Sequence, residues 1–201
     1  MASGVHAPNA KRGNVQHAQT EAEPKLTAKG VIIQTPRQVR HMPIGLSEEI
    51  RLQHATTLNQ ALVDTLMLYH LYKKAHWQVV GHTFYQLHLL FDKHATEQLA
   101  LVDLIAERVQ LLGGVATGMP HDIVEQTNLE RAPQGVEEIP ALLDRLLAAH
   151  ERILMECRGL ARDAEQSGDF GTNDLLVSNV IRTNELQVWF IAEHTVGAPN
   201  A

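Results

Sequence analysis

The chain of 201 residues contains one cysteine, only 4% aromatic residues and no long apolar run. Because Cys157 has no partner for an internal disulfide, we expect it to be a small buried side chain in a reducing compartment. No segment approaches the roughly 18 consecutive apolar residues of a membrane helix, and the first residues lack the apolar stretch of a secretory signal. These absences predict a cytoplasmic protein that does not enter a membrane.

A strand pattern and an internal repeat are also missing, whereas helical periodicity covers most of residues 47–196. Caps and breakers set the expected bounds, for example Ser47 as an N-cap and Gly113-Gly114 as a stop signal. Four long helices with one long connection predict an all-α four-helix bundle whose crossover carries a short helix. We expect long helices over about 48–80, 84–112, 140–167 and 173–196, the last capped by Thr172, and a short helix over 119–127.

Four potential metal ligands follow helical spacing in the second helix. His88 and Asp92 share a face at i,i+4, as do Asp103 and Glu107, and the step of 11 residues between the pairs returns nearly to the same azimuth. The two pairs lie roughly 16 Å apart along the axis at about 1.5 Å per residue, which is too far for one ion. A second copy packed antiparallel across a two-fold axis would place each pair beside the other pair of its partner. The spacing therefore predicts two identical metal sites at a homodimer interface.

Imidazole and carboxylate ligands without cysteine suit Fe(II), Zn(II) or Mn(II), and spacing alone does not choose among them. A surface helix whose acids and histidine face solvent is the simpler alternative. Metal inside a single bundle is disfavoured, because no histidine has a glutamate three residues before it.

Other candidates near this stretch have plainer interpretations. His76 follows the apolar stripe of the first helix and, taken alone, could be a hydrogen-bonded core residue, with Trp77 filling the core. His82 and His94 lie off the ligand stripe, and we expect His94 to be a hydrogen-bonded residue of the bundle. The fourth helix is expected to bury Leu175, Leu176, Val180, Leu186, Trp189 and Phe190.

The run HW-x3-G-x2-F-x3-H-x3-D, followed by D-x3-ER and LGG, resembles the signature of the Dps family, mini-ferritins also called DNA-binding proteins from starved cells. The match spans His76 to Gly114 without an insertion, and the helical layout extends it over about residues 47–196. The resemblance implies a ferritin-like bundle and places Trp77 beside the iron site as a shield and electron donor. The intersubunit ferroxidase centre that it implies consists of His76, His88, Asp92, Asp103 and Glu107.

By the same resemblance, the protein is expected to form a hollow dodecamer of two-fold dimers. It would oxidise Fe(II), preferably with hydrogen peroxide, store Fe(III) as mineral and protect DNA from oxidative damage. The alternative is a non-enzymatic DNA-compacting or structural protein with an interface Zn(II) site. Acidic residues flank the turn between the third and fourth long helices and match the region that lines acidic three-fold pores in relatives. At one position where some relatives have a further aspartate, this chain has Phe170. These candidates, which could equally be ordinary turn and cap acids, are Glu165, Asp169 and Asp174.

Charge is distributed unevenly along the chain. Residues 1–46 hold six basic and two acidic residues, a net charge of +4. Because the whole chain has a net charge of −6, the remaining residues carry −10. We divide the chain into a flexible basic tail, residues 1–46, and a bundle domain, residues 47–201. The tail could solubilise the protein, dock on a neighbouring subunit, or bind DNA and associate with the nucleoid. Its DNA-binding candidates are Lys11, Arg12, Lys25, Lys29, Arg37 and Arg40.

Overall fold

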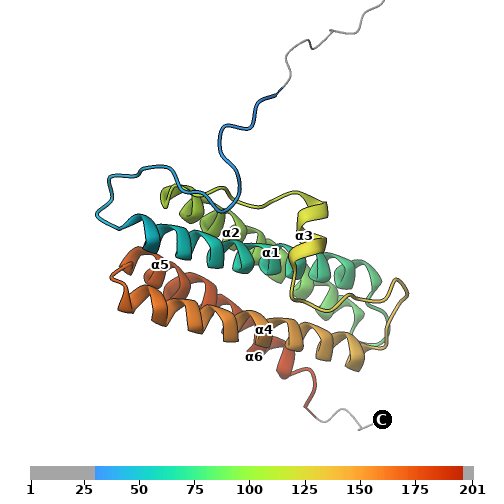
Figure 1. Cartoon of the computed structure of the whole chain (residues 1–201). Coiled ribbons are helices and arrows are strands. Elements are labelled where there is room, and N and C mark those ends of the chain that lie inside the picture. Colours follow the sequence, from blue (N-terminus) through green and yellow to red (C-terminus); the bar gives the residue numbers. More distant parts are fainter. Residues whose placement is uncertain (1–29, 197–201) are drawn as a thin grey trace, which may run out of the picture. The chain divides into compact units, whose positions relative to one another are not determined.

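The computed structural model describes residues 30–196, and every regular element in that range is helical. Helices α1 and α2 form one antiparallel pair beside a second pair made by α4 and the last arm of the chain, as Figure 1 shows. The short helix α3 lies in the crossover between α2 and α4 and packs against α1. This arrangement confirms the predicted four-helix bundle with a long crossover. The elements are α1 Glu48–Gln78, α2 Phe84–Leu111, α3 Pro120–Gln126, α4 Ile139–Gln166, α5 Phe170–Asp174, the π-helical η1 Leu175–Ile181 and α6 Arg182–Ala192.

The ends of α1 and α2 follow the predicted signals. Ser47 caps α1, because its hydroxyl accepts a hydrogen bond from the Ile50 amide at 3.3 Å. Gly113 ends α2 at φ 85°, and a Cβ there would lie 2.5 Å from the carbonyl oxygen of Arg40. That close approach brings the segment before α1 against the end of α2.

Hydrogen bonds hold this preceding segment in place. The Arg40 amide donates to the Gly113 carbonyl at 2.9 Å, and buried Arg51 donates to the Arg40 carbonyl at 2.6 Å. The Gln34 amide group also donates to Gly113, at 2.8 Å. Residues 34–46 thus belong to the helical unit by their hydrogen bonds. The division into a tail of residues 1–46 and a domain of residues 47–201 stays a prediction, and residues 1–29 lie outside the described range.

One apolar core runs through the bundle and is supplied by all four long helical arms. Its largest fully buried side chains include Tyr72, Phe91, Leu143 and Leu176. Cys157 is buried within it, as expected. None of the described helices combines the length and the apolar character needed to cross a membrane.

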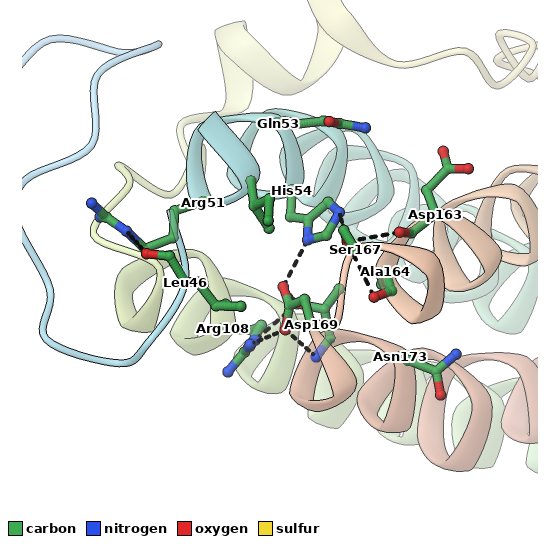
Figure 2. A network of polar contacts seen from close by, with 12 residues as sticks. Leu46, Arg51, Gln53, His54, Arg108, Asp163, Ala164, Ser167, Asp169 and Asn173 are labelled. Atoms are coloured by element: carbon green, nitrogen blue, oxygen red, sulfur yellow. Dashed lines mark hydrogen bonds and ion pairs between the residues drawn. The ribbon is translucent and has the colours of Figure 1, made fainter. Parts of the chain in front are cut away.

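The turn from α4 into α5 is organised by Asp169 (Figure 2). Its carboxylate accepts from the Thr172 amide at 3.0 Å and from the Thr172 hydroxyl at 2.6 Å, and it pairs with His54 of α1 at 2.7 Å and with Arg108 of α2. The prediction that Thr172 caps the last helix is therefore wrong. Asp169 is the cap, since its carboxylate accepts from the amide of Thr172, three residues later, and the helix begins at Phe170.

The last arm contains a π-helical turn that the periodicity did not predict. Because η1 winds with i→i+5 hydrogen bonds, residues after it are rotated relative to an uninterrupted α-helix. Leu176 and Val180 are buried as expected, but Leu186 is 42% exposed and Trp189 is 57% exposed. The prediction that these last two fill the core is wrong.

Candidate metal centre

Two histidines from neighbouring helices form the centre of the candidate site. Nδ1 of His76 donates to the backbone carbonyl of His88 at 2.7 Å, and Nδ1 of His88 donates to the carbonyl of His76 at 2.8 Å. The rings stack with centroids 3.8 Å apart and planes 18° from parallel. With both Nδ1 protons held by backbone, each neutral ring carries its lone pair on Nε2. That is the protonation state in which an imidazole binds a metal ion.

Asp92 lies beside this pair, with Oδ1 4.0 Å from Nε2 of His76. The same oxygen accepts a hydrogen bond from Lys73 of α1 at 2.7 Å, and this bond lowers the pKa of Asp92 below its ordinary value. Three of the five predicted ligands thus lie near one another, although not closely enough to hold an ion as they stand, and beside them lies a cation that the sequence did not predict there. A lysine three residues before His76 on α1 was the signal that could have identified it.

The other two predicted ligands lie further along α2. Asp103 and Glu107 are both exposed, and neither lies with the histidine pair in the single chain. Over residues 30–196, no three His, Cys, Asp or Glu side chains gather closely enough to hold a metal ion. The five candidates therefore fall into two groups at different positions along the continuous helix α2, and we call these groups the half-sites.

Exposed apolar side chains surround these half-sites. Trp77 is 71% exposed and lies next to His76, with Nζ of Lys73 5.9 Å from its ring centroid. Leu99, midway between the half-sites, is 48% exposed, whereas Ala95 is buried in the chain's own core rather than on this face. Exposed large apolar side chains occur along the whole of α2, and we call them the exposed strip, which would suit an interface. The exposed large apolar residues of α2 are Phe84, Tyr85, Leu89, Leu99, Leu104 and Leu111.

The predicted pore acids have different surroundings. Glu165 and Asp174 are exposed, and Asp174 accepts a hydrogen bond from Ser178 at 2.7 Å. Asp169, however, is 1% exposed and is occupied by its cap bonds, the contact with His54 and the ion pair with Arg108. Of the two interpretations left open for Asp169, the structure therefore agrees with the turn and cap acid, because a carboxylate buried with Arg108 and His54 is inaccessible from outside.

Among the predicted DNA-binding residues, Arg37 and Arg40 are exposed. The remaining four, Lys11, Arg12, Lys25 and Lys29, lie outside the described residues.

A second polar group lies in the middle of the bundle. His94 is fully buried there with Nδ1 3.2 Å from the Tyr72 hydroxyl, which confirms its expected role as a hydrogen-bonded bundle residue. Together with five further polar side chains, His94 forms a fully buried group that we call the central polar cluster. Its members are Tyr72, His94, Gln98, His150, Asn184 and Gln187.

Comparisons with known proteins agree with this architecture. A model of the ferritin-like domain matches residues 55–198. DpsC from Streptomyces coelicolor is 56% identical with a TM-score of 0.81, and the match covers 84% of this chain and 98% of that one. An uncharacterised protein from Kitasatospora aureofaciens is 49% identical over 148 residues, 74% of this chain and 99% of the relative. A "DNA protection during starvation protein" from Agrobacterium fabrum is 31% identical over 137 residues, 68% of this chain and 84% of the relative.

Proposed function

Because the chain belongs to the Dps family of ferritin-like proteins, we propose that it is a ferroxidase that oxidises Fe(II) with hydrogen peroxide and stores Fe(III) as a mineral. The observation that carries the proposal is the histidine pair. His76 and His88 are held by each other's backbone with Nε2 available, beside the carboxylate of Asp92. Removing Fe(II) and peroxide together would protect DNA from oxidative damage, in keeping with the name of the Agrobacterium fabrum relative.

The complete site is proposed to need two copies of the chain. An antiparallel α2 from a second copy would set its Asp103 and Glu107 opposite His88 and Asp92 of the first. The exposed strip around Leu99 would then be buried, and the two half-sites would become two identical complete sites. Such dimers are proposed to assemble into a hollow dodecamer, with Glu165 and Asp174 at the iron entry pores.

Each ligand type has a separate task at this site. The carboxylates of Asp92, Asp103 and Glu107 would offset the charge of Fe(III) more than that of Fe(II), which favours oxidation. Two imidazoles fix where the iron binds, because their Nδ1 bonds hold the rings still. Trp77 is proposed to cover the site from solvent and to donate electrons during turnover.

The test removes the charge of one half-site without removing its volume. Asp103→Asn with Glu107→Gln should leave a folded oligomer but lower the initial rate of Fe(II) oxidation at least tenfold, because neutral ligands offset less of the Fe(III) charge. The rate is followed by ferric absorbance after adding peroxide to anaerobic protein and Fe(II). The matched control is Asp144→Asn with Glu151→Gln, two exposed acids of α4. A wild-type rate in the first variant would refute the assignment of Asp103 and Glu107.

The same assay separates the alternative in which the interface holds Zn(II) without turnover. A structural zinc protein would bind Zn(II) at the site and leave Fe(II) oxidation at the rate of protein-free buffer. Zn(II) or Mn(II) bound at a ferroxidase site would instead act as a competitive inhibitor of iron oxidation.

The remaining parts of the proposal concern place and partners. A protein of this kind is expected in the cytoplasm, where its Fe(II) and its DNA are found. DNA contact is proposed for the basic residues of the N-terminal segment, since the −10 charge of the rest of the chain repels phosphate.

A further inference from the structure

None of the residues in the central polar cluster is a proposed iron ligand, yet burying the cluster is costly. Six polar side chains in the middle of an apolar bundle must be hydrogen-bonded to one another to offset their desolvation. They come from all four long helical arms, and Asn184 and Gln187 lie in α6, which follows the π-helical turn η1. Such turns occur frequently at functional sites, because they change which residues face inward.

The hydrogen bonds determine where each proton in the cluster lies. The Asn184 amide donates to the Val180 carbonyl at 2.7 Å, so its oxygen is the atom facing Nδ1 of His150 at 2.8 Å. Nδ1 of His150 therefore carries a proton, and Nε2 of the neutral ring is an acceptor. That nitrogen lies 2.5 Å from the Tyr72 oxygen, so the phenol donates its proton to His150.

The other contacts of Tyr72 agree with this assignment. Because the Tyr72 hydroxyl uses its proton in the hydrogen bond to His150, its oxygen accepts a hydrogen bond from Nδ1 of His94 at 3.2 Å. Nε2 of His94 is then a buried acceptor with no hydrogen-bond partner in the described chain. The phenol is thus held between one imidazole that accepts its proton and another that donates to its oxygen.

Tyr72 is also close to the proposed ferroxidase site. It lies four residues before His76 on the same face of α1, so the two Cα atoms are about one turn, or about 6 Å, apart along the axis. Its ring centroid is 6.1 Å from that of Phe91, the residue before Asp92 on α2. The Tyr72 phenol is therefore connected to proposed iron ligands in two ways. One is along the backbone of α1 to His76, and the other is through the packed Phe91 ring to Asp92 on α2.

Resting on the proposed ferroxidase function, we propose that Tyr72 is a redox-active electron donor to the iron site and that His150 is its proton acceptor. The step applies when peroxide meets a site holding one Fe(II). Reduction of peroxide to two hydroxide ions takes two electrons, one from Fe(II), which becomes Fe(III), and one from Tyr72. The phenol passes its proton to Nε2 of His150, leaving a neutral tyrosyl radical and an imidazolium.

The cycle closes when a later Fe(II) gives its electron to the radical and His150 returns the proton. Burial lowers the pKa of His150 to about 4 and raises the pKa of Tyr72 well above its ordinary value, so the proton returns to the phenol once the ring is reduced. Without this donor, one-electron reduction of peroxide at a half-filled site would release hydroxyl radical. The cluster would thus protect the protein and nearby DNA while iron is scarce.

The sequence allows a sharp test, because it contains only three tyrosines, Tyr69, Tyr72 and Tyr85. Anaerobic protein receives one Fe(II) per chain and one equivalent of peroxide, and is freeze-quenched for electron paramagnetic resonance. In Tyr69→Phe with Tyr85→Phe, which leaves Tyr72 untouched, we expect a tyrosyl signal that changes width with ring-deuterated tyrosine. In Tyr72→Phe we expect loss of that signal and a severalfold rise in hydroxyl-radical spin adducts.

The outcomes separate this inference from the proposed function. Iron oxidation by Tyr69→Phe with Tyr85→Phe without a tyrosyl signal overturns the role of Tyr72 and leaves the ferroxidase intact. A tyrosyl signal that survives in folded Tyr72→Phe has the same meaning. If wild-type protein does not oxidise Fe(II) at all, the proposed function fails and the inference fails with it.

Discussion

At the scale of single residues, Lys73 places a positive charge at the proposed metal site. Its ammonium donates to the Asp92 oxygen that lies 4.0 Å from Nε2 of His76. A metal ion binding there has to displace this ammonium or share the carboxylate with it, and the two cations repel each other.

Lys73→Gln should therefore bind Co(II), a spectroscopic probe for Fe(II), severalfold more tightly than wild type in a titration at fixed ionic strength. Lys74→Gln is the matched control, because Lys74 pairs with Glu137 away from the site and its removal should leave the affinity unchanged. Weaker binding by Lys73→Gln alone would mean that Lys73 positions Asp92 rather than competing for it.

A second residue-scale prediction concerns pH. Burial lowers the pKa of His150 to about 4 and that of His94 to about 3, against an ordinary 6.5. Between pH 6.5 and 4 the unfolded chain binds these protons and the folded chain does not, so stability is full above pH 6.5 and falls as pH drops. Each histidine should cost about 2 kcal/mol at pH 5 relative to pH 7.5.

Urea denaturation at the two pH values and one protein concentration measures this loss. His150→Gln should be less stable at pH 7.5 but should lose less stability on going to pH 5. His82→Gln serves as the control, since His82 is exposed and its removal should not alter the pH dependence. An unchanged dependence in His150→Gln would show that His150 is already charged in the folded state.

The sequence was sufficient for some residues and insufficient for others, for a physical reason. Spacing along one helix places His88 and Asp92 on one face, and a helical repeat is a local property that needs no tertiary information. Lys73, His150 and the Tyr72 hydroxyl acquire their partners from other helices. The sequence left two interpretations of Asp169 open for the same reason, because its burial depends on His54 and Arg108, 115 and 61 residues away.

At the scale of elements, caps and breakers predicted the ends of α1 and α2 to within a few residues, but nothing in the periodicity marked η1. A π-helical turn contains only one more residue than an α-helical turn, and the apolar pattern before it continues without a gap. The sequence therefore gives no sign of it. Its effect appears afterwards, where Trp189 turns outward while Asn184 and Gln187 turn inward. The central polar cluster depends on that rotation.

The turn between α4 and α5 gives an element-scale prediction. A Cβ at Gly171 would lie 2.9 Å from Nη1 of Arg108, the guanidinium that pairs with buried Asp169. Gly171→Ala should therefore push Arg108 away and lower stability by about 1–3 kcal/mol, despite the higher helix propensity of alanine. In thermal unfolding it should melt below wild type.

Gly159 of α4 is the matched control, because a Cβ there would meet nothing closer than 4.0 Å. Gly159→Ala should raise stability by up to about 1 kcal/mol through helix propensity alone. If both variants melted above wild type, the Arg108 contact would not constrain Gly171.

At the scale of the whole molecule, the single chain keeps the proposed metal ligands apart in two groups. The histidine pair lies at one end of the exposed face of α2 and the second carboxylate pair at the other, with exposed Leu99 between them. A chain that closed its own site would need a bend in α2, which is one continuous helix over Phe84–Leu111. Completion by a second copy requires only the two-fold symmetry that most homodimers have.

This geometry makes a complementation prediction that no site within one chain shares. His88→Ala and Glu107→Ala, each alone, damage both sites of their homodimers. In a mixed dimer one site combines both lesions, while the other draws His88 from the Glu107→Ala chain and Glu107 from the His88→Ala chain. Because random pairing gives half mixed dimers with one intact site each, co-refolded mixtures should regain up to about a quarter of wild-type sites.

A mixture of His88→Ala with Asp92→Ala, two lesions in the same half-site, should regain none. If native mass spectrometry confirms mixed dimers of His88→Ala and Glu107→Ala but Fe(II) oxidation stays at the level of either parent, the ligands do not come from two subunits.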